Sequence, residues 1–192
     1  DDGFEDSSVL DGSHVRRINP DLTGTVDVTA ATSLTENAHL AFIGVQKGGS
    51  FDISEDLARE MLDGPTNPNG RPNRDVLRPW INGADITQRR RDTWIIDFGV
   101  DMPVEEAALY EVPFEHIKRH VKPTRIQNNR RQYREYWWIH AEARPAMREA
   151  IRPLQRYIAT PRVSKHRVFV WIDEQILPAS AVVVIAREDD YF

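Results

Sequence analysis

Apolar and polar positions alternate in several short runs of the chain, a spacing of two that predicts β-strands. These runs span residues 13–18, 23–32, 39–47, 93–99, 156–164, 166–172 and 179–186. Apolar residues that recur every three to four positions predict helices. This pattern covers residues 54–64, 73–79, 102–121, 124–141 and 144–154. Strands and short helices interspersed in this way predict a mixed α+β fold with a largely antiparallel sheet.

Local signals fix some of these boundaries. Ser54 is expected to cap the helix that follows it and Gly64 to end that helix. Residues 64–73, rich in Gly, Pro and Asn, predict a loop. Pro113 is expected to divide 102–121 into two helical pieces. The run 124–141, capped by Thr124, predicts one helix about 25 Å long, placed as a helical insertion before the final strands.

A length of 192 residues suits one domain, expected over residues 14–192, preceded by a disordered acidic tail at 1–13. The chain starts with Asp1 and ends in a predicted strand, so we expect a piece of a longer polypeptide. No run approaches the length of a membrane span. The absence of cysteine fits a reducing compartment, and we expect a cytoplasmic protein.

Charge is distributed unevenly along the chain. The formal net charge is −5, but residues 1–114 hold 10 Lys+Arg against 21 Asp+Glu, and residues 115–167 hold 14 against 4. The central segment therefore carries +10 inside an acidic chain, which is typical of a localised surface for a polyanion. The alternative is a solvated helical face whose arginines pair with the acidic surplus of residues 1–114.

The stretch HVKPTRIQNNRRQYREYWWIH, residues 120–140, concentrates this positive charge together with large aromatic side chains. Arginine and lysine neutralise phosphates and read guanine, and asparagine or glutamine can read adenine. A second basic run, PRVSKHR, lies between two predicted strands. The candidate DNA-binding residues are Lys122, Arg125, Asn128, Arg130, Arg131, Arg134, Arg162, Lys165, His166 and Arg167.

Adjacent Trp137 and Trp138 could stack on unpaired bases. We favour a structural interpretation, in which one ring is buried and the other lies along the surface under an arginine. Trp80 and Trp94 are likewise expected in the core.

Catalytic motifs are not found. The sequence has no phosphate-binding GxxxxGK[ST] loop, no GxSxG motif and no nuclease pattern of paired acids before a lysine. His116 and His120 have a zinc-compatible spacing, but no third ligand is evident and Lys118 and Arg119 disfavour a dication. We expect neither a catalytic nor a metal site in this chain.

Five phrases resemble, in the same order, the C-terminal part of bacterial adenine-specific DNA methyltransferases. They are VLRPWINGADI (76–86), TWIIDFG (93–99), PFEHIKRHVKPTR to REYWW (113–138), RYIATPRVSKHRVFVWI (156–172) and ILPASAVVVIAREDDY (176–191). The family is that of large single-chain type II restriction–modification enzymes and related phage-defence methylases, and the resemblance covers about residues 38–192.

The resemblance implies a target recognition domain that reads double-stranded DNA. It also implies that S-adenosylmethionine and the methyl-transfer motifs belong to a methyltransferase domain upstream, outside this chain, and some members add a nuclease. One alternative is a structural or protein-interaction domain whose basic helix docks on an acidic partner domain. A second alternative is a binder of single strands or RNA through Tyr and Trp side chains.

Overall fold

The computed structural model describes residues 8–20, 22–25, 31–32 and 34–189, and the chain divides into two compact units, Asp1–Ala38 and His39–Phe192. In the first unit, β1 (Ser8–Leu10) pairs antiparallel with β2 (Ser13–Val15), and a 3-10 turn, η2, spans Thr35–Asn37. Asp11 and Gly12 join the two strands with positive φ angles, as an Asp-Gly hairpin turn requires. The predicted tail 1–13 lies partly outside the described residues, and its expected disorder stays a prediction.

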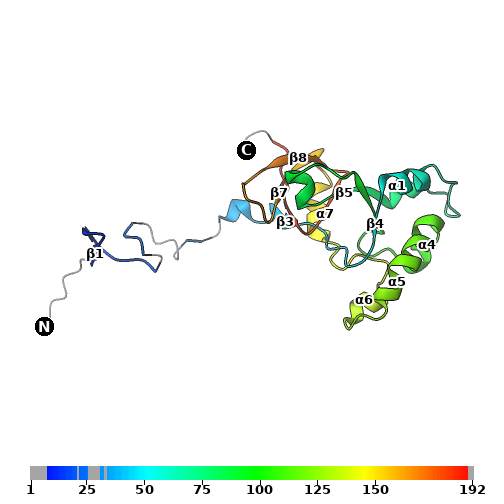
Figure 1. Cartoon of the computed structure of the whole chain (residues 1–192), viewed down its shortest axis with the longest axis horizontal. Helices are drawn as coiled ribbons and strands as arrows, with labels where there is room; N and C mark the ends of the chain where they lie inside the picture. Colours follow the sequence, from blue (N-terminus) through cyan, green and yellow to red (C-terminus); the bar gives the residue numbers. More distant parts are fainter. Residues whose placement is uncertain (1–7, 21, 26–30, 33, 190–192) are drawn as a thin grey trace. The chain divides into compact units, whose positions relative to one another are not determined.

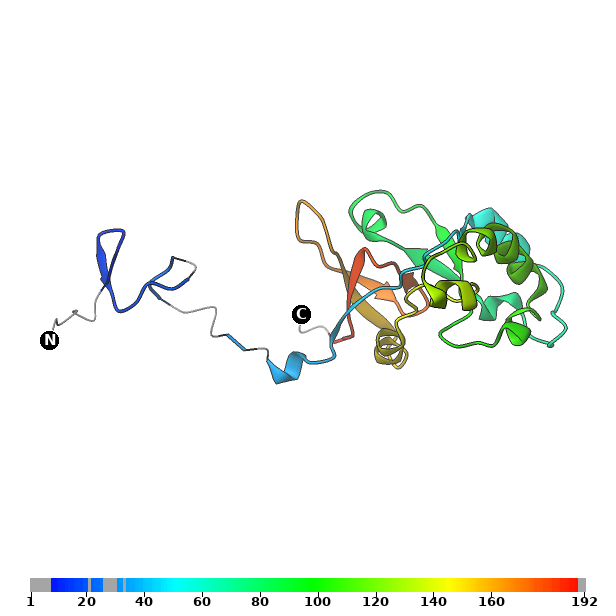
Figure 2. The same ribbon diagram turned by 90° about the horizontal axis from the view of Figure 1, so that it is seen from below.

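The second unit (Figures 1 and 2) contains two four-stranded sheets. The first sheet has the order β3-β10-β7-β8 and is antiparallel throughout, and the second has the order β4-β6-β5-β9 with one parallel pair, β5 with β9. The strands are β3 (Ala41–Ile43), β4 (Asp52–Ile53), β5 (Leu77–Ile81), β6 (Thr93–Ile96), β7 (Arg156–Pro161), β8 (Val170–Asp173), β9 (Leu177–Pro178) and β10 (Val182–Ile185). The predicted α+β class with a largely antiparallel arrangement is confirmed.

Short helices connect these strands. They are α1 (Glu55–Leu62), the 3-10 turn η3 (Asn73–Asp75), α2 (Gly83–Thr87), α3 (Val104–Ala107), α4 (Glu111–His120), α5 (Lys122–Arg125), α6 (Arg131–Glu135) and α7 (Pro145–Ile151). As Figure 1 shows, α1, α4, α5 and α6 gather at one end of the second unit, away from β7 and β8. The helices of residues 111–135 therefore lie apart from β7 and β8, which follow them in the chain.

Several local predictions are confirmed. The Ser54 hydroxyl accepts a hydrogen bond from the Leu57 N–H at 3.3 Å and caps α1. The strands predicted around residues 93–99, 156–164, 166–172 and 179–186 correspond to β6, β7, β8 and β10. Of the predicted strand 23–32, residues 26–30 lie outside the described part.

The helix predicted over 73–79 is found only at its start, where the 3-10 turn η3 spans Asn73–Asp75, and it is wrong from Leu77, where strand β5 begins. Leu77, Trp80 and Ile81 are buried between neighbouring strands, so the gain from burial exceeds the helix preference of the local sequence. Pro79 fits because β5 pairs with β9 only from Trp80 onward, where Trp80 lies opposite Leu177. After β5, Asn82 is the N-cap of α2, and its side chain accepts from the Ala84 N–H at 2.8 Å.

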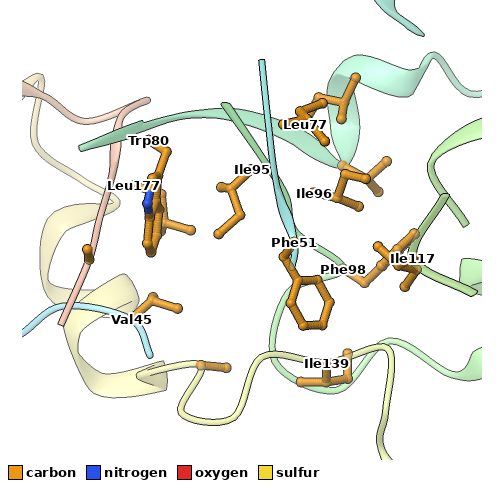
Figure 3. Close-up of a cluster of buried hydrophobic side chains, with 14 of the residues drawn as sticks. Val45, Phe51, Leu77, Trp80, Ile95, Ile96, Phe98, Ile117, Ile139 and Leu177 are labelled. Carbon is orange, nitrogen blue, oxygen red and sulfur yellow. The ribbon is translucent and has the colours of Figure 1, made fainter. Parts of the chain in front are cut away.

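One cluster of buried apolar side chains draws on both sheets and on the helices (Figure 3). Ile95 and Ile96 of β6 lie near its middle, with Phe51, Ile117 of α4 and Leu177 of β9 around them. Burying a large apolar side chain contributes about 2 kcal/mol, so this shared core fixes the helices of residues 104–151 on the sheets. The candidate binding residues lie on the helices and loops that this core holds in place.

Candidate nucleic-acid interface

The predicted DNA-binding residues fall into two groups that lie apart in Figures 1 and 2. The helical cluster, on α4 to α6, comprises the predicted residues Lys122, Arg130, Arg131 and Arg134 together with Lys118 and Arg119, which were not predicted, and all six are exposed or half-buried. The loop cluster, between β7 and β8, comprises Arg162, Lys165, His166 and Arg167, all exposed. The structure thus brings the predicted residues together within each group and not into one continuous patch.

The single helix predicted over 124–141 is wrong. Two short helices, α5 and α6, are separated by residues 126–130, and Thr124 donates to the Val121 carbonyl and does not cap a helix. The Asn128 side chain accepts from the Arg130 N–H at 2.9 Å. An asparagine that bonds its own backbone in this way competes with continued helix. The Asn128 amide is therefore used in the turn and is half-buried.

Arg125 differs from the other predicted residues because it is buried, with 2% of its surface exposed. Its guanidinium donates to the Ile139 carbonyl and lies 4.7 Å from the ring centre of Tyr133 and 5.6 Å from that of Phe51. Burial lowers its pKa from the usual value, more than Tyr133 raises it. We therefore remove Arg125 from the candidate DNA contacts and assign it to the packing of α5.

Other members of the helical cluster have local partners. Arg131 forms an ion pair with Glu135 at 2.6 Å, and the Arg130 guanidinium donates to the Tyr133 hydroxyl at 3.2 Å. Arg134 donates to the carbonyls of Asn128 and Asn129 at 2.8 and 3.0 Å, which fixes the turn before α6. These exposed groups can still face phosphate, but Arg134 also has a structural role.

Trp137 and Trp138 are both buried, at 7% and 8% exposure. The indole N–H of Trp138 donates to the Met102 carbonyl at 2.8 Å, and the Lys122 ammonium lies 4.9 Å from the Trp137 ring centre. The structural interpretation is confirmed. The expectation that one ring lies at the surface under an arginine is wrong, since both rings are in the core and the cation is a lysine. Trp80 is buried and Trp94 is partly buried, as expected.

The loop cluster is the more open of the two groups. Val163, at 92% exposure, marks how far this loop projects from the sheet. Arg162 donates to the Ser180 carbonyl at 3.2 Å, while the side chains of Lys165 and Arg167 pair with no carboxylate in the described part of the chain. Cations held out on a loop between two paired strands are well placed to meet an anionic surface.

A third basic element was missed by the sequence reasoning. Arg89, Arg90 and Arg91 lie exposed in the loop between α2 and β6. A cavity of about 630 Å³ is lined both by Gln88 beside them and by Arg162, so this loop and the loop cluster border the same hollow. The signal was available, because three consecutive arginines stand between two predicted elements, but they lie in the acidic part of the chain.

Most ion pairs of the basic segment are local. Lys118 pairs with Glu115, and Arg131 pairs with Glu135. Among the residues that the structure describes, Arg148 of this segment forms an ion pair with Asp97, a carboxylate of residues 1–114. The acidic surplus of residues 1–114 therefore leaves both clusters largely unneutralised within residues 34–189.

Asp97, Arg148 and His140 form a buried polar group beneath the surface. Burial alone would raise the pKa of Asp97, but the Arg148 guanidinium, at 2.7 Å, outweighs it and lowers the pKa to about 2. Burial lowers the pKa of His140 to about 4, more than the nearby Asp97, 3.6 Å away, raises it. The His140 Nε2 lies 2.9 Å from the Ile96 carbonyl and donates to it, which fixes the tautomer of the neutral ring.

No cluster of His, Asp and Glu side chains suited to a metal is found among the described residues. His116 and His120 have ring centres 4.5 Å apart, and burial lowers the pKa of His116. Within the same described part, none of the helices is both long and apolar enough to cross a membrane.

No protein-family model and no curated protein matches the chain. Among solved structures, it is similar to part of the Type IIL restriction–modification enzyme MmeI, whose structure was determined in complex with DNA. The likeness has a TM-score of 0.59 at 16% sequence identity and covers 92% of this chain. It shows a shared fold. The chain spans 23% of the length of that enzyme.

Proposed function

We propose that this chain is a module that recognises a sequence in double-stranded DNA for an adenine-specific DNA methyltransferase of a restriction–modification system. The observation that carries the proposal is the loop cluster, in which exposed Lys165 and Arg167 have no acidic partner in the described structure. The fold shared with part of a restriction–modification enzyme solved with DNA supports the same conclusion.

Duplex DNA presents a dense row of phosphates, and each one neutralised by a cation releases counterions. The loop cluster and the neighbouring Arg89 and Arg90 supply such cations on adjacent loops, and the helical cluster supplies more at the other end of the unit. Phosphate contacts would set the register of the duplex, while arginine and amide side chains such as Gln88 would reach base edges.

Methyl transfer would take place elsewhere in the whole enzyme. We propose that S-adenosylmethionine binds the parent's methyltransferase domain, which acts on the adenine while this module holds the site. The module itself would contribute positioning and no chemistry, and it would act in the bacterial cytoplasm.

The test is fluorescence anisotropy of the chain with a random-sequence duplex and a matched single strand, from about 25 to about 300 mM salt. Duplex affinity should fall steeply with salt and exceed that for the single strand. In a variant with Arg162→Ala, Lys165→Ala and Arg167→Ala, the slope of log K against log salt should fall by about 2 to 3.

The matched control replaces three exposed arginines outside both clusters, Arg59→Ala, Arg152→Ala and Arg187→Ala, and removes the same number of charges. Equal losses in both triple variants would show a nonspecific charge effect and contradict the assignment of the loop cluster. An absence of duplex binding at the lowest salt would contradict the DNA-binding function and favour docking of the basic surfaces on an acidic protein domain.

A further inference from the structure

A cavity of about 480 Å³ lies between α6 and the turn that follows β6. Its walls include Gln132, Tyr136 and Asp101, and buried Arg125 and His140 also line it. The volume lies in the range of pockets that hold small molecules. The fully paired duplex considered above leaves this cavity unused.

Tyr136 offers a surface for stacking. It is 53% exposed, and its ring leans against buried Trp138, with ring centres 5.8 Å apart and an interplanar angle of 48°. The Tyr136 N–H donates to the Gln132 carbonyl at 3.0 Å, so these two residues are adjacent at the end of α6. An aromatic ring held in place, with an amide beside it, can stack a planar ligand and bind its edge.

Two residues that line the cavity each have a buried polar atom that makes no hydrogen bond in the described part of the chain. Arg125 Nε and His140 Nδ1 are buried and make no hydrogen bond to the described residues. Because His140 donates from Nε2 to the Ile96 carbonyl, its Nδ1 is an acceptor in the neutral ring, whereas Arg125 Nε carries a hydrogen. His140 Nδ1 lies 3.6 Å from the Asp97 carboxylate, so Arg125 Nε is the donor left for a ligand. Because a buried polar group is costly when left unpaired, this donor favours a ligand with a polar edge over an apolar one.

The surroundings indicate what kind of planar ligand fits. Arg130, Arg131 and Arg134 are exposed on the helix that borders the cavity. Cationic side chains around an aromatic pocket are typical of proteins that bind an unpaired nucleotide, because the cations hold the flanking phosphates. Across the cavity, Asp101 is exposed and offers a carboxylate, which accepts hydrogen bonds from an exocyclic amino group.

We propose that this cavity binds an unpaired nucleobase that carries an exocyclic amino group, such as adenine. The base would stack on Tyr136, accept a hydrogen bond from the Gln132 amide at a ring nitrogen, and donate from its amino group to Asp101. This inference rests on the proposed DNA-binding function and adds a second mode to it, in which a base that has left the stack is held beside the paired duplex.

The experiment compares three duplexes of otherwise identical sequence by fluorescence anisotropy: fully paired, with a single bulged adenine, and with a single bulged thymine. The bulged adenine should bind about tenfold more tightly than the paired duplex, as one stacked base contributes. Tyr136→Ala should remove this gain and leave the affinity for the paired duplex unchanged. Asp101→Ala should lower the affinity for the duplex with the bulged adenine to that for the duplex with the bulged thymine.

The control is Trp171→Ala, which removes another exposed aromatic ring, 37% exposed and outside the cavity, and should keep the gain. Circular dichroism establishes that each variant is folded. If the wild-type protein binds the bulged and paired duplexes equally, the pocket assignment fails and the proposed DNA-binding function stands.

If the paired duplex does not bind at all, the proposed function fails. Binding of an adenine-containing single strand then tests whether the pocket holds a base. Binding of that strand that is lost in Tyr136→Ala would support the pocket by itself. No binding of that strand would overturn the pocket as well.

Discussion

The guanidinium of Arg148 donates two hydrogen bonds to the carboxylate of Asp97, at 2.7 and 3.0 Å. This pair joins α7 to the end of β6, across 51 positions of the chain, and the Asp97 side chain is 3% exposed. A buried pair with this bidentate geometry is costly to break, because the remaining charge has no water to solvate it.

Replacing Arg148 with Ala should lower the free energy of unfolding by about 3 to 5 kcal/mol, since it leaves Asp97 charged and unpaired. Urea denaturation measures the change. The neighbouring Arg152→Ala removes an exposed arginine at the end of the same helix and should change the stability by less than about 0.5 kcal/mol. A loss of similar size in both variants would contradict the role assigned to the pair.

Stability should fall as the pH is lowered from about 6.5 to about 4. The pKa of His140 is about 4 in the folded chain and about 6.5 for an unperturbed histidine, so the unfolded chain binds a proton first and its binding favours unfolding. The slope should reach up to about 1.4 kcal/mol per pH unit. Further loss is expected between 3.8 and about 2, where Asp97 is protonated in the unfolded chain before the folded one.

His140→Gln is the variant that isolates the first window, because glutamine does not titrate. Urea titrations at a series of pH values should show that this variant loses the slope between about 6.5 and about 4. A wild-type protein whose stability is flat over that window would show that His140 is not held neutral by burial.

Arg125→Ala should destabilise the fold by about 3 kcal/mol, because the Ile139 carbonyl loses its donor and the Tyr133 ring loses the cation beneath it. The salt dependence of DNA binding by the folded variant should not change, since a buried side chain reaches no phosphate. Arg130→Ala is the opposite case: stability should be nearly unchanged while the slope falls by about 1. A reduced slope in Arg125→Ala would place its guanidinium against DNA.

The loop between α2 and β6, which carries Arg89 and Arg90, gives a separate prediction. Arg89→Ala together with Arg90→Ala should lower the slope of log K against log salt by about 2 if this loop and the loop cluster face one duplex. The third arginine, Arg91, is left in place because it forms an ion pair with buried Asp85 at 2.9 Å. Unchanged salt dependence in the double variant would restrict the interface to the loop between β7 and β8.

Ser54→Ala should lower the free energy of unfolding by about 1 kcal/mol, because the Leu57 N–H loses its capping acceptor. Ser50→Ala, an exposed serine just before β4, is the matched control and should have little effect. Thermal or urea denaturation distinguishes the two, and equal stability of both variants would mean that water replaces the cap at no cost.

The sequence predicts well where one local signal decides the structure. The cap at Ser54 is such a case, and so is the alternation in residues 93–99. The segment 124–141 shows where local signals fail, because its aromatic residues have helical spacing but bind into a core built from distant strands. Once Trp137 and Trp138 are buried, residues 126–130 must turn, and Asn128 stabilises that turn. Only the position of Asn128 and Asn129 in the sequence indicated such a break.

The sequence likewise predicted one part of the candidate interface and not another. The loop cluster is exposed as expected, because a short basic run between two strands has nowhere to be buried. Arg125 could not be told from its neighbours, since its burial depends on Phe51 and Ile139, which the sequence alone does not place beside it. The cavity that Gln88 and Arg162 both line likewise depends on how α2 packs next to β7.

The first sheet also constrains how this protein reaches its folded state. Strand β3 pairs with β10, and Ile43 lies opposite Val183, 140 positions later in the chain. During translation, β3 therefore remains unpaired until nearly all of the second unit has been synthesised. Such distant pairing slows folding and exposes an unpaired strand edge to aggregation. We expect this unit to fold late in synthesis and to depend on chaperones when it is overproduced.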